Sequence, residues 1–402
     1  MDTVSSLLDA ISQVGRDRQR GGYSRPVYSA AELTLREWFG AEAAKRGLAV
    51  ETDRNGILWA WWDIEGGDRT GALVTGSHLD SVPGGGAFDG ALGVAAALVA
   101  VDLLRERGVQ PRRALALTVF PEEEGSRFGV ACLGSRLLTG AIDPDRARNR
   151  RDPDGNTFAD VSRANGVDPA GLGRDAGALR TIGDFVELHV EQGRGLIDLD
   201  APVAVGSSIL GHGRWRMSIT GQGNHAGTTL MEDRADPMIT AAQIVLAIRS
   251  IARAEPHARA TVGRLQPMPG GTNVIASRVD LWFDVRHPED SVTAQLVEKI
   301  HGQAQKAAAF EGCSVTLTEE SFSGTVHFDT ALQRQLQTSL GGSPALPTGA
   351  GHDAGVLSAQ VPAGMLFIRN PTGISHSPEE FVERDDADVG AGALADALED
   401  LL

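Results

Sequence analysis

The sequence predicts an α/β fold in which a smaller α+β domain interrupts the main domain. In the first half of the chain, apolar runs that fit buried strands alternate with helical segments, as in a mostly parallel sheet. From about residue 212 the strands alternate polar and apolar residues, and the order becomes β-α-β-β-α-β, as in ferredoxin-like units. The first style returns after about residue 328. We therefore expect a main domain of residues 1–211 and 328–402 and an inserted domain of residues 212–327.

Apolar residues predict most elements of the main domain. Three short apolar runs are expected to be buried strands, and two segments with periodic apolar residues are expected to be helices. The strands are Ala72–Ser77, Ala114–Phe120 and Phe185–Val190, and the helices are residues 30–47 and Gly90–Arg105. The tryptophan-rich stretch at 55–62 is expected to pack at a sheet edge or an interface. Residues 141–183 have few large apolar side chains, so we expect a helical, partly exposed insertion.

The inserted domain shows the alternation of half-exposed strands. Apolar and polar residues alternate cleanly along Arg278–Arg286, and Trp215, Met217 and Ile219 show the same pattern. The other elements expected here are helices Pro237–Ile251 and Val292–Phe310 and strands Arg259–Leu265 and Cys313–Thr318.

Composition excludes several functional classes. Among 402 residues, Lys and Arg number 37 and Asp and Glu 53, so the net charge of −16 argues against nucleic acid as a partner. No apolar run approaches the roughly 18 residues that a membrane span needs, so no membrane partner is expected. Cys132 and Cys313 are isolated, which fits a reducing compartment, and the N-terminus resembles no signal peptide. A cytoplasmic enzyme is the expected class.

Three predicted strands end in residues that bind metals. His78 and Asp80 follow the first strand, Glu122–Glu124 follow the second, and His189 closes the third. The carboxyl ends of parallel strands line the ligand crevice of open α/β sheets, so these side chains are expected to converge. Each residue alone has a plainer explanation, because a lone histidine is more often structural and a run of glutamates is more often a solvated helix end.

Asp89 and His376 complete a set that fits two metal ions. Asp89 lies in the glycine-rich turn GGGAFDG (84–90), where a turn former is the plainer explanation, and His376 lies near the C-terminus. Two divalent ions about 3.5–4 Å apart need a bridging carboxylate and further nitrogen or oxygen ligands. A further carboxylate must stay free of metal to act as a base. The spacing does not specify a reaction, and GGGAFDG lacks the GxGxxG pattern of nucleotide binding.

Seven segments of the chain resemble one enzyme family. They are GSHLDSVPGGGAFDGALGV (76–94), EEGSRFG (123–129), ELHVEQG (187–193), GNHAGTT (223–229), DVRHP (284–288), GAGHDA (349–354) and ISHSPEE (374–380). In this order they resemble the M20-type dinuclear metallohydrolases. The most similar branch holds the N-carbamoyl-L-amino-acid hydrolases, β-ureidopropionase and allantoate amidohydrolase. The resemblance implies a metallopeptidase-like catalytic domain that is interrupted by a ferredoxin-like dimerisation and lid domain.

The resemblance also implies a role for each candidate ligand. His78 and His189 would hold one divalent ion, Glu124 and His376 the other, and Asp89 would bridge them. Zinc is the first expectation for both ions, with manganese, cobalt or nickel as alternatives. Glu123 would be the general base and Asp80 would orient His78. A one-residue slip of the alignment along the three glutamates would exchange the base and the ligand.

A second group of residues is implied to bind a substrate that carries a carboxylate. Arg286 and Asn273 would bind the carboxylate, and a guanidinium suits this because it can donate two parallel hydrogen bonds. Gln192 would contact one end of the substrate, and His352 would be a pocket residue. His225 would stabilise the oxyanion in the site of a neighbouring subunit, so a homodimer is expected.

The reaction implied is hydrolysis of the linear ureido C–N bond of an N-carbamoyl amino acid or an allantoate-like compound, with release of ammonia and carbon dioxide. Pocket shape would distinguish this activity from that of an aminoacylase or dipeptidase of the same family. A non-catalytic protein with a vestigial site is the alternative from another class, and the presence of every expected ligand argues against it. The sequence does not identify the natural ureido acid.

Overall fold

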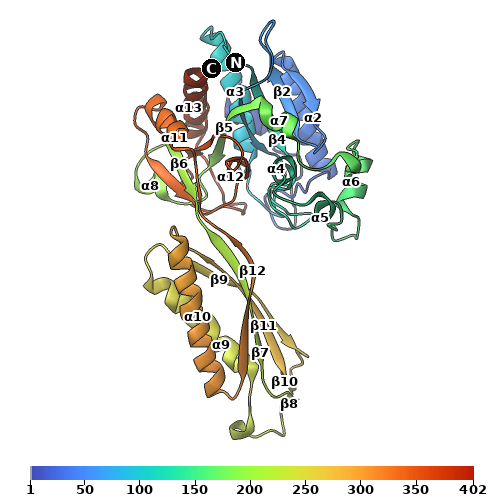
Figure 1. The fold of residues 1–402 in the computed structure, drawn as a ribbon, viewed down its shortest axis with the longest axis vertical. Coiled ribbons are helices and arrows are strands. Elements are labelled where there is room, and N and C mark those ends of the chain that lie inside the picture. The colour runs from blue at the N-terminus through green and yellow to red at the C-terminus, as the bar shows by residue number, and fades with distance from the viewer. Residues whose placement is uncertain (1) are drawn as a thin grey trace. The chain divides into compact units, whose positions relative to one another are not determined.

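The computed structural model describes residues 2–402, which divide into two compact units (Figure 1). The first unit comprises Met1–Ser208 and His327–Leu402, and the second comprises Ile209–Val326. These boundaries lie close to the proposed ones, which follow residues 211 and 327. The α/β class with an inserted α+β unit is confirmed. In the described part of the chain, no helix is long and apolar enough to cross a membrane.

A nine-stranded sheet forms the centre of the first unit. The strand order is β1-β2-β4-β3-β5-β15-β6-β13, with β14 beside β6. The strands are β1 (Ala49–Thr52), β2 (Leu58–Trp62), β3 (Ala72–His78), β4 (Leu115–Phe120), β5 (Ile182–Val190), β6 (Val203–Ile209), β13 (Val326–His327), β14 (Ala345–Thr348) and β15 (Ala363–Ile368). The four central strands β4, β3, β5 and β15 are parallel, whereas β1, β2 and β6 pair antiparallel. The parallel centre agrees with the continuous apolar runs, because strands covered on both faces need no polar side.

Helices cover this sheet and complete its core. Helix α3 (Ala91–Glu106) is buried along most of its length, because its alanines let α1 (Val4–Ala10) and α13 (Arg384–Leu401) pack closely against it. Helix α12 (Asp353–Leu357) packs on β5 and β15. The other helices are α2 (Ala30–Lys45), α4 (Leu133–Thr139), α5 (Pro144–Arg148), α6 (Phe158–Ala164), η1 (Pro169–Gly171), α7 (Ala176–Thr181), α8 (Gly195–Asp198) and α11 (Thr330–Ser339). The insertion predicted at 141–183 thus consists of short helices.

The second unit is a four-stranded antiparallel sheet with two helices. Its strands follow the order β12-β7-β11-β9, the arrangement of a ferredoxin-like unit. The elements are β7 (His212–Thr220), α9 (Pro237–Ala254), β9 (Arg259–Met268), β11 (Arg278–Arg286), α10 (Asp290–Phe310) and β12 (Ser314–Ser323). Helices α9 and α10 lie side by side on one face of the sheet (Figure 1). A small ribbon of β8 (Asn224–His225) and β10 (Val274–Ile275) and a short helix η2 (Met231–Asp233) complete the unit.

The tryptophan-rich stretch forms β2, the strand next to the edge of the sheet. Trp59 and Trp61 stack with ring centroids 5.4 Å apart, and each indole N–H donates to a carboxylate, of Asp53 and Glu51 respectively. The residues therefore have a packing role, as expected.

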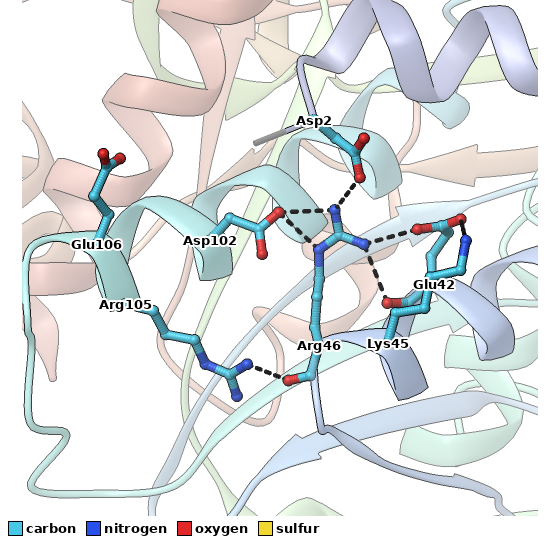
Figure 2. A pocket seen from close by; sticks show the side chains of 7 residues that line it. All are labelled: Asp2, Glu42, Lys45, Arg46, Asp102, Arg105 and Glu106. Atoms are coloured by element: carbon cyan, nitrogen blue, oxygen red, sulfur yellow. Dashed lines mark hydrogen bonds and ion pairs between the residues drawn. The ribbon is translucent and has the colours of Figure 1, made fainter.

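A charged pocket lies between α2 and α3, and none of the predicted site residues lines it (Figure 2). The guanidinium of Arg46 occupies its centre and pairs with the carboxylates of Asp2, Glu42 and Asp102 at 2.8–3.0 Å. Because the charge of Arg46 is already matched, we assign this group a structural role that ties α2 to α3.

Candidate metal centre

The parallel strands bring the expected ligands to one edge of the sheet. His78 is the last residue of β3, Glu122–Glu124 follow β4, and His189 is next to last in β5. Strand β3 lies between β4 and β5, so the three strand ends are neighbours. Asp89 lies just before α3, whose first residue is Ala91. The convergence follows from the topology, since the ligand crevice of an open α/β sheet lies beyond its carboxyl ends.

His78, His189 and Asp89 form a first buried triad. The Nε2 atom of His78 lies 3.5 Å from that of His189 and 3.4 Å from Oδ1 of Asp89. The Nε2 atom of His189 lies 3.1 Å from the same oxygen. Burial alone would raise the pKa of Asp89, but its contacts with the imidazoles of His189 and His78 outweigh burial and hold the pKa well below its ordinary value. Asp89 is therefore ionised.

Both histidines present a lone pair to the space between them. The Nδ1 atom of His78 lies 3.0 Å from the backbone carbonyl of Asp80, and that of His189 lies 3.0 Å from the carbonyl of Val190. A carbonyl only accepts, so each Nδ1 carries the proton and each Nε2 is left to bind an electrophile. This arrangement is typical of metal-binding histidines.

Asp89, Glu124 and His376 form a second triad. The Nε2 atom of His376 lies 3.4 Å from Oδ2 of Asp89 and 3.4 Å from Oε2 of Glu124. Asp89 thus offers Oδ1 to the first triad and Oδ2 to the second. The His376 side chain is half-exposed, and its backbone is left-handed with a φ of 57°.

The two triads suit divalent transition metals. Ligand atoms about 2.1 Å from a tetrahedral ion lie roughly 3.4 Å from one another, which agrees with the separations given above. Each triad combines imidazole with carboxylate, a donor set suited to zinc, manganese, cobalt or nickel. The carboxyl groups of Glu123, Glu124 and Asp80 have pKa values that burial raises, and two bound cations would favour their ionised forms.

Glu123 lies beside the first triad and belongs to neither. Its Oε2 is 3.6 Å from Nε2 of His78, and its Oε1 accepts a hydrogen bond from the thiol of Cys132 at 3.3 Å. Burial raises the pKa of Glu123 well above its ordinary value, although His78 opposes this shift. A buried carboxylate with a raised pKa suits a group that accepts and returns a proton.

The loop after β4 gives its three glutamates different surroundings. Oε1 of Glu122 accepts backbone N–H groups of Arg127 and Phe128, and burial raises its pKa to about 8. Glu122 therefore closes its own loop, whereas Glu123 lies by His78 and Glu124 by His376. This supports the alignment in which Glu123 is the base.

Asp80 contacts both His78 and the loop that carries the three glutamates. Its carboxylate accepts the backbone N–H groups of Glu123 and Glu124, each at 3.1 Å. The carboxylate is 3.7 Å from Nδ1 of His78, so the backbone carbonyl is the closer contact. The sequence could not distinguish these two contacts, because both come from the same residue.

Two of the five candidate substrate residues also lie at the metal centre. Gln192 donates to Oδ2 of Asp89 at 3.2 Å, and its buried carbonyl oxygen has no hydrogen-bond partner among the described residues. The His352 ring lies 4.5 Å from that of His189, centroid to centroid, and both of its buried nitrogens are likewise unpaired in the described part of the chain. These polar atoms remain available to a ligand.

The other three candidates lie in the second unit, where His225 and Asn273 are neighbours and Arg286 lies apart from them. His225 is exposed on β8, and the backbone carbonyl of Asn273 accepts the N–H of Ala226 beside it. This ribbon adjoins the end of β11 that contains Arg278, because β10 directly precedes β11 and β8 comes shortly after Thr220, which pairs with Arg278. Arg286 is at the other end of β11, where its Nε donates to Asp284 at 2.8 Å. The nine residues of β11 separate the two ends by roughly 27 Å.

Sequence reasoning missed Cys132, Ser375 and Glu380. Cys132 contacts the base, Glu380 binds the backbone of Asp89, and Ser375 bonds to Glu380 and Gln192. The only available signal was their place in or near the motifs, and this did not reveal where each side chain points.

A histidine and carboxylate centre with a shared aspartate, at the edge of a parallel sheet, is characteristic of metal-dependent hydrolases. Fold and site together place the chain in this class. Residues 74–400 match the model of peptidase family M20/M25/M40, and the chain belongs to this family.

The chain is similar over nearly its full length to enzymes that act on C–N bonds other than peptide bonds. It is 35% identical to an N-carbamoyl-L-amino acid amidohydrolase of Geobacillus stearothermophilus, over 96% of this chain and 95% of that protein. It is 31% identical to the allantoate amidohydrolase of Bacillus subtilis, over 99% and 97%. The crystal structure of a hydantoinase/carbamoylase family amidase from Burkholderia multivorans superimposes with a TM-score of 0.86 at 30% identity, over 98% and 96%.

Proposed function

We propose that the protein hydrolyses the carbamoyl C–N bond of a linear ureido compound that carries a carboxylate, such as an N-carbamoyl amino acid or allantoate. The observation that carries the proposal is Asp89, whose two oxygens face two separate histidine-containing triads. The activities named for the full-length relatives supply the bond and the substrate class.

The ligand assignment follows the two triads. His78 and His189 would hold one ion, Glu124 and His376 the other, with Asp89 between them. When bound, two divalent ions would lower the pKa of a water molecule and polarise the carbamoyl carbonyl. Zinc is our first choice for both positions.

Glu123 moves the proton in the proposed mechanism. It accepts a proton from the attacking water and then returns it to the leaving nitrogen, so one carboxyl group serves as base and acid. The Cys132 thiol fixes one oxygen of this carboxylate, which leaves the other for the proton. Asp80 holds the loop that aims Glu123, while Gln192 and His352 offer unpaired polar atoms to the ureido group.

The carboxylate of the substrate would bind Arg286. The His225 and Asn273 ribbon is at the opposite end of β11, so one copy of the second unit cannot offer all three side chains to one substrate. We propose that Arg286 comes from one subunit of a homodimer, whereas His225 and Asn273 come from the other. In this scheme the second unit is both lid and dimerisation domain. We also propose a cytoplasmic location, on the basis of two cysteines that form no disulfide.

Removal of metal is expected to abolish ammonia release. The protein would be treated with a chelator, refilled with Zn²⁺, Mn²⁺, Co²⁺ or Ni²⁺, and assayed on N-carbamoyl-L-amino acids and allantoate. At least one ion should restore activity, because the unfilled site has neither of the charges that activate water and carbonyl.

N-acetyl amino acids and dipeptides serve as matched controls in the same assay, since they offer a carboxylate without a carbamoyl group. Faster turnover of either control would replace the proposed reaction by an aminoacylase or dipeptidase activity. No turnover of any substrate, with no bound metal, would indicate a vestigial site.

Arg286→Ala is expected to reduce kcat/KM on carboxylate substrates by about 2–4 kcal/mol, which is roughly 30-fold to 800-fold, as for other broken charge pairs. Most of the effect should be in KM, because the carboxylate is bound equally in the ground state and the transition state. Steady-state kinetics measure this. Arg214→Ala is the matched control, because Arg214 is exposed and lies 4.0 Å from the same Asp284. An Arg286→Ala protein with unchanged kcat/KM would exclude Arg286 from the site.

A further inference from the structure

Glu380 is a buried carboxylate that no step of the proposed mechanism uses. It is 3% exposed and lies four residues after His376 in the C-terminal loop. Its Oε1 accepts the backbone N–H groups of Phe88 at 3.1 Å and of Asp89 at 3.0 Å. Its Oε2 accepts the hydroxyl of Ser375 at 3.1 Å. One carboxylate thus connects the loop of Asp89 with the loop of His376.

A closed ring of hydrogen bonds passes through this carboxylate. Ser375 donates to Glu380 and accepts from the amide of Gln192 at 3.0 Å. The same amide nitrogen donates to Oδ2 of Asp89 at 3.2 Å, and the backbone N–H of Asp89 returns to Glu380. The ring therefore holds both the backbone of the shared ligand and the oxygen that faces the second triad.

The Asp89 loop is shaped to receive Glu380. A Cβ atom added to Gly86 would lie 2.2 Å from Oε1 of Glu380. Glycine is required there because the loop backbone approaches the carboxylate too closely for any side chain. The conformation of the Asp89 loop therefore depends on its contact with Glu380.

The two metal positions differ in how they are supported. His78 and His189 are on adjacent central strands, where the sheet fixes them. Glu124 and His376 are in loops, and His376 has the left-handed backbone that few non-glycine residues adopt. The second position therefore depends more on contacts between loops.

We propose that Glu380 is a positioning residue for the second metal position, where it holds the Asp89 and His376 loops at the separation that lets both bind one ion. This inference rests on the metal-dependent function proposed above. Groups that orient metal ligands contribute about 10-fold to 100-fold to metal affinity. We expect the loss of Glu380 to weaken the second ion by this factor and to leave the first ion within about threefold.

The test is a calorimetric titration of chelated protein with Zn²⁺, together with the visible spectrum of the Co²⁺ form. Glu380→Ala is expected to bind the first ion normally and the second at least tenfold more weakly, with a changed Co²⁺ spectrum. Glu380→Gln keeps an oxygen for the two backbone N–H groups, so it should bind the second ion within a few-fold of the parent. Glu379→Ala is the matched control, because the adjacent Glu379 is exposed and contacts only Ser377 among the hydrogen bonds described.

The inference would be overturned if Glu380→Ala bound the second ion as tightly as the parent does. It would also be overturned if Glu380→Gln lost as much affinity for the second ion as Glu380→Ala. Should Glu380→Ala fail to fold, Ser375→Ala removes the same ring with less disturbance, and an unchanged second ion in that variant would also overturn it. Failure of the proposed function is a separate result: a parent protein that binds two ions and releases no ammonia refutes the reaction, while the comparison of variants still stands. A parent that binds fewer than two ions refutes both.

Discussion

Glu123→Gln is expected to lower kcat by about 10²-fold to 10⁴-fold, while both metal ions stay bound. The amide is nearly the same size as the carboxylate and can still accept the Cys132 thiol, so the loop should keep its shape. It cannot take a proton from water, nor return one to the leaving nitrogen. Because the side chain belongs to neither triad, metal content should not fall.

The measurement pairs ammonia release under saturating substrate with metal analysis of the same samples. Glu122→Gln is the matched control, because Glu122 is the preceding residue, is also buried, and accepts hydrogen bonds from the backbone of Arg127 and Phe128. Its kcat should stay near the parent value. If Glu123→Gln keeps full turnover, or Glu122→Gln shows the large loss instead, the base has been misassigned.

Asp89→Ala is expected to lose both ions and all measurable turnover. Each triad takes one oxygen from this side chain, so the substitution removes one ligand from each position and the only charge they share. It also leaves Glu123, Glu124 and Asp80 close together without the cations that would compensate them.

His376→Ala is the comparison variant, because the two substitutions should leave different numbers of bound ions. His376 belongs to the second triad alone, so its removal should leave about one ion per chain, bound by the strand-borne histidines. Metal analysis after dialysis distinguishes the two variants. Two ions in Asp89→Ala would show that the aspartate is not shared.

The strands and the ligands at their ends could be predicted from sequence because each depends on local pattern. The apolar runs that became β3, β4 and β5 are continuous, and parallel topology alone then brings His78, Glu123 and His189 together. Asp89 and His376 could be named as candidates, but no local pattern placed them beside the strand ends, and their roles came from the resemblance to a family.

The remaining features depend on contacts that no local pattern encodes. Glu379 and Glu380 are adjacent and identical, yet only Glu380 turns inward, because Gly86 leaves room for it nearly 300 residues away in the chain. The separation of Arg286 from the His225 ribbon follows from the register of β11 with β7, and this register cannot be deduced from the residues of either strand alone. Strands β1 and β2 were not predicted as strands, because neither alternates between apolar and polar faces: β2 is apolar throughout and β1 is exposed throughout.

The most direct test of the central claim is a crystal structure of the zinc-loaded protein, with anomalous diffraction recorded at the zinc absorption edge. We predict two anomalous peaks about 3.5–4 Å apart, with Asp89 between them. One should lie by His78 and His189 and the other by Glu124 and His376. A single peak, or two peaks that do not share Asp89, would contradict the account.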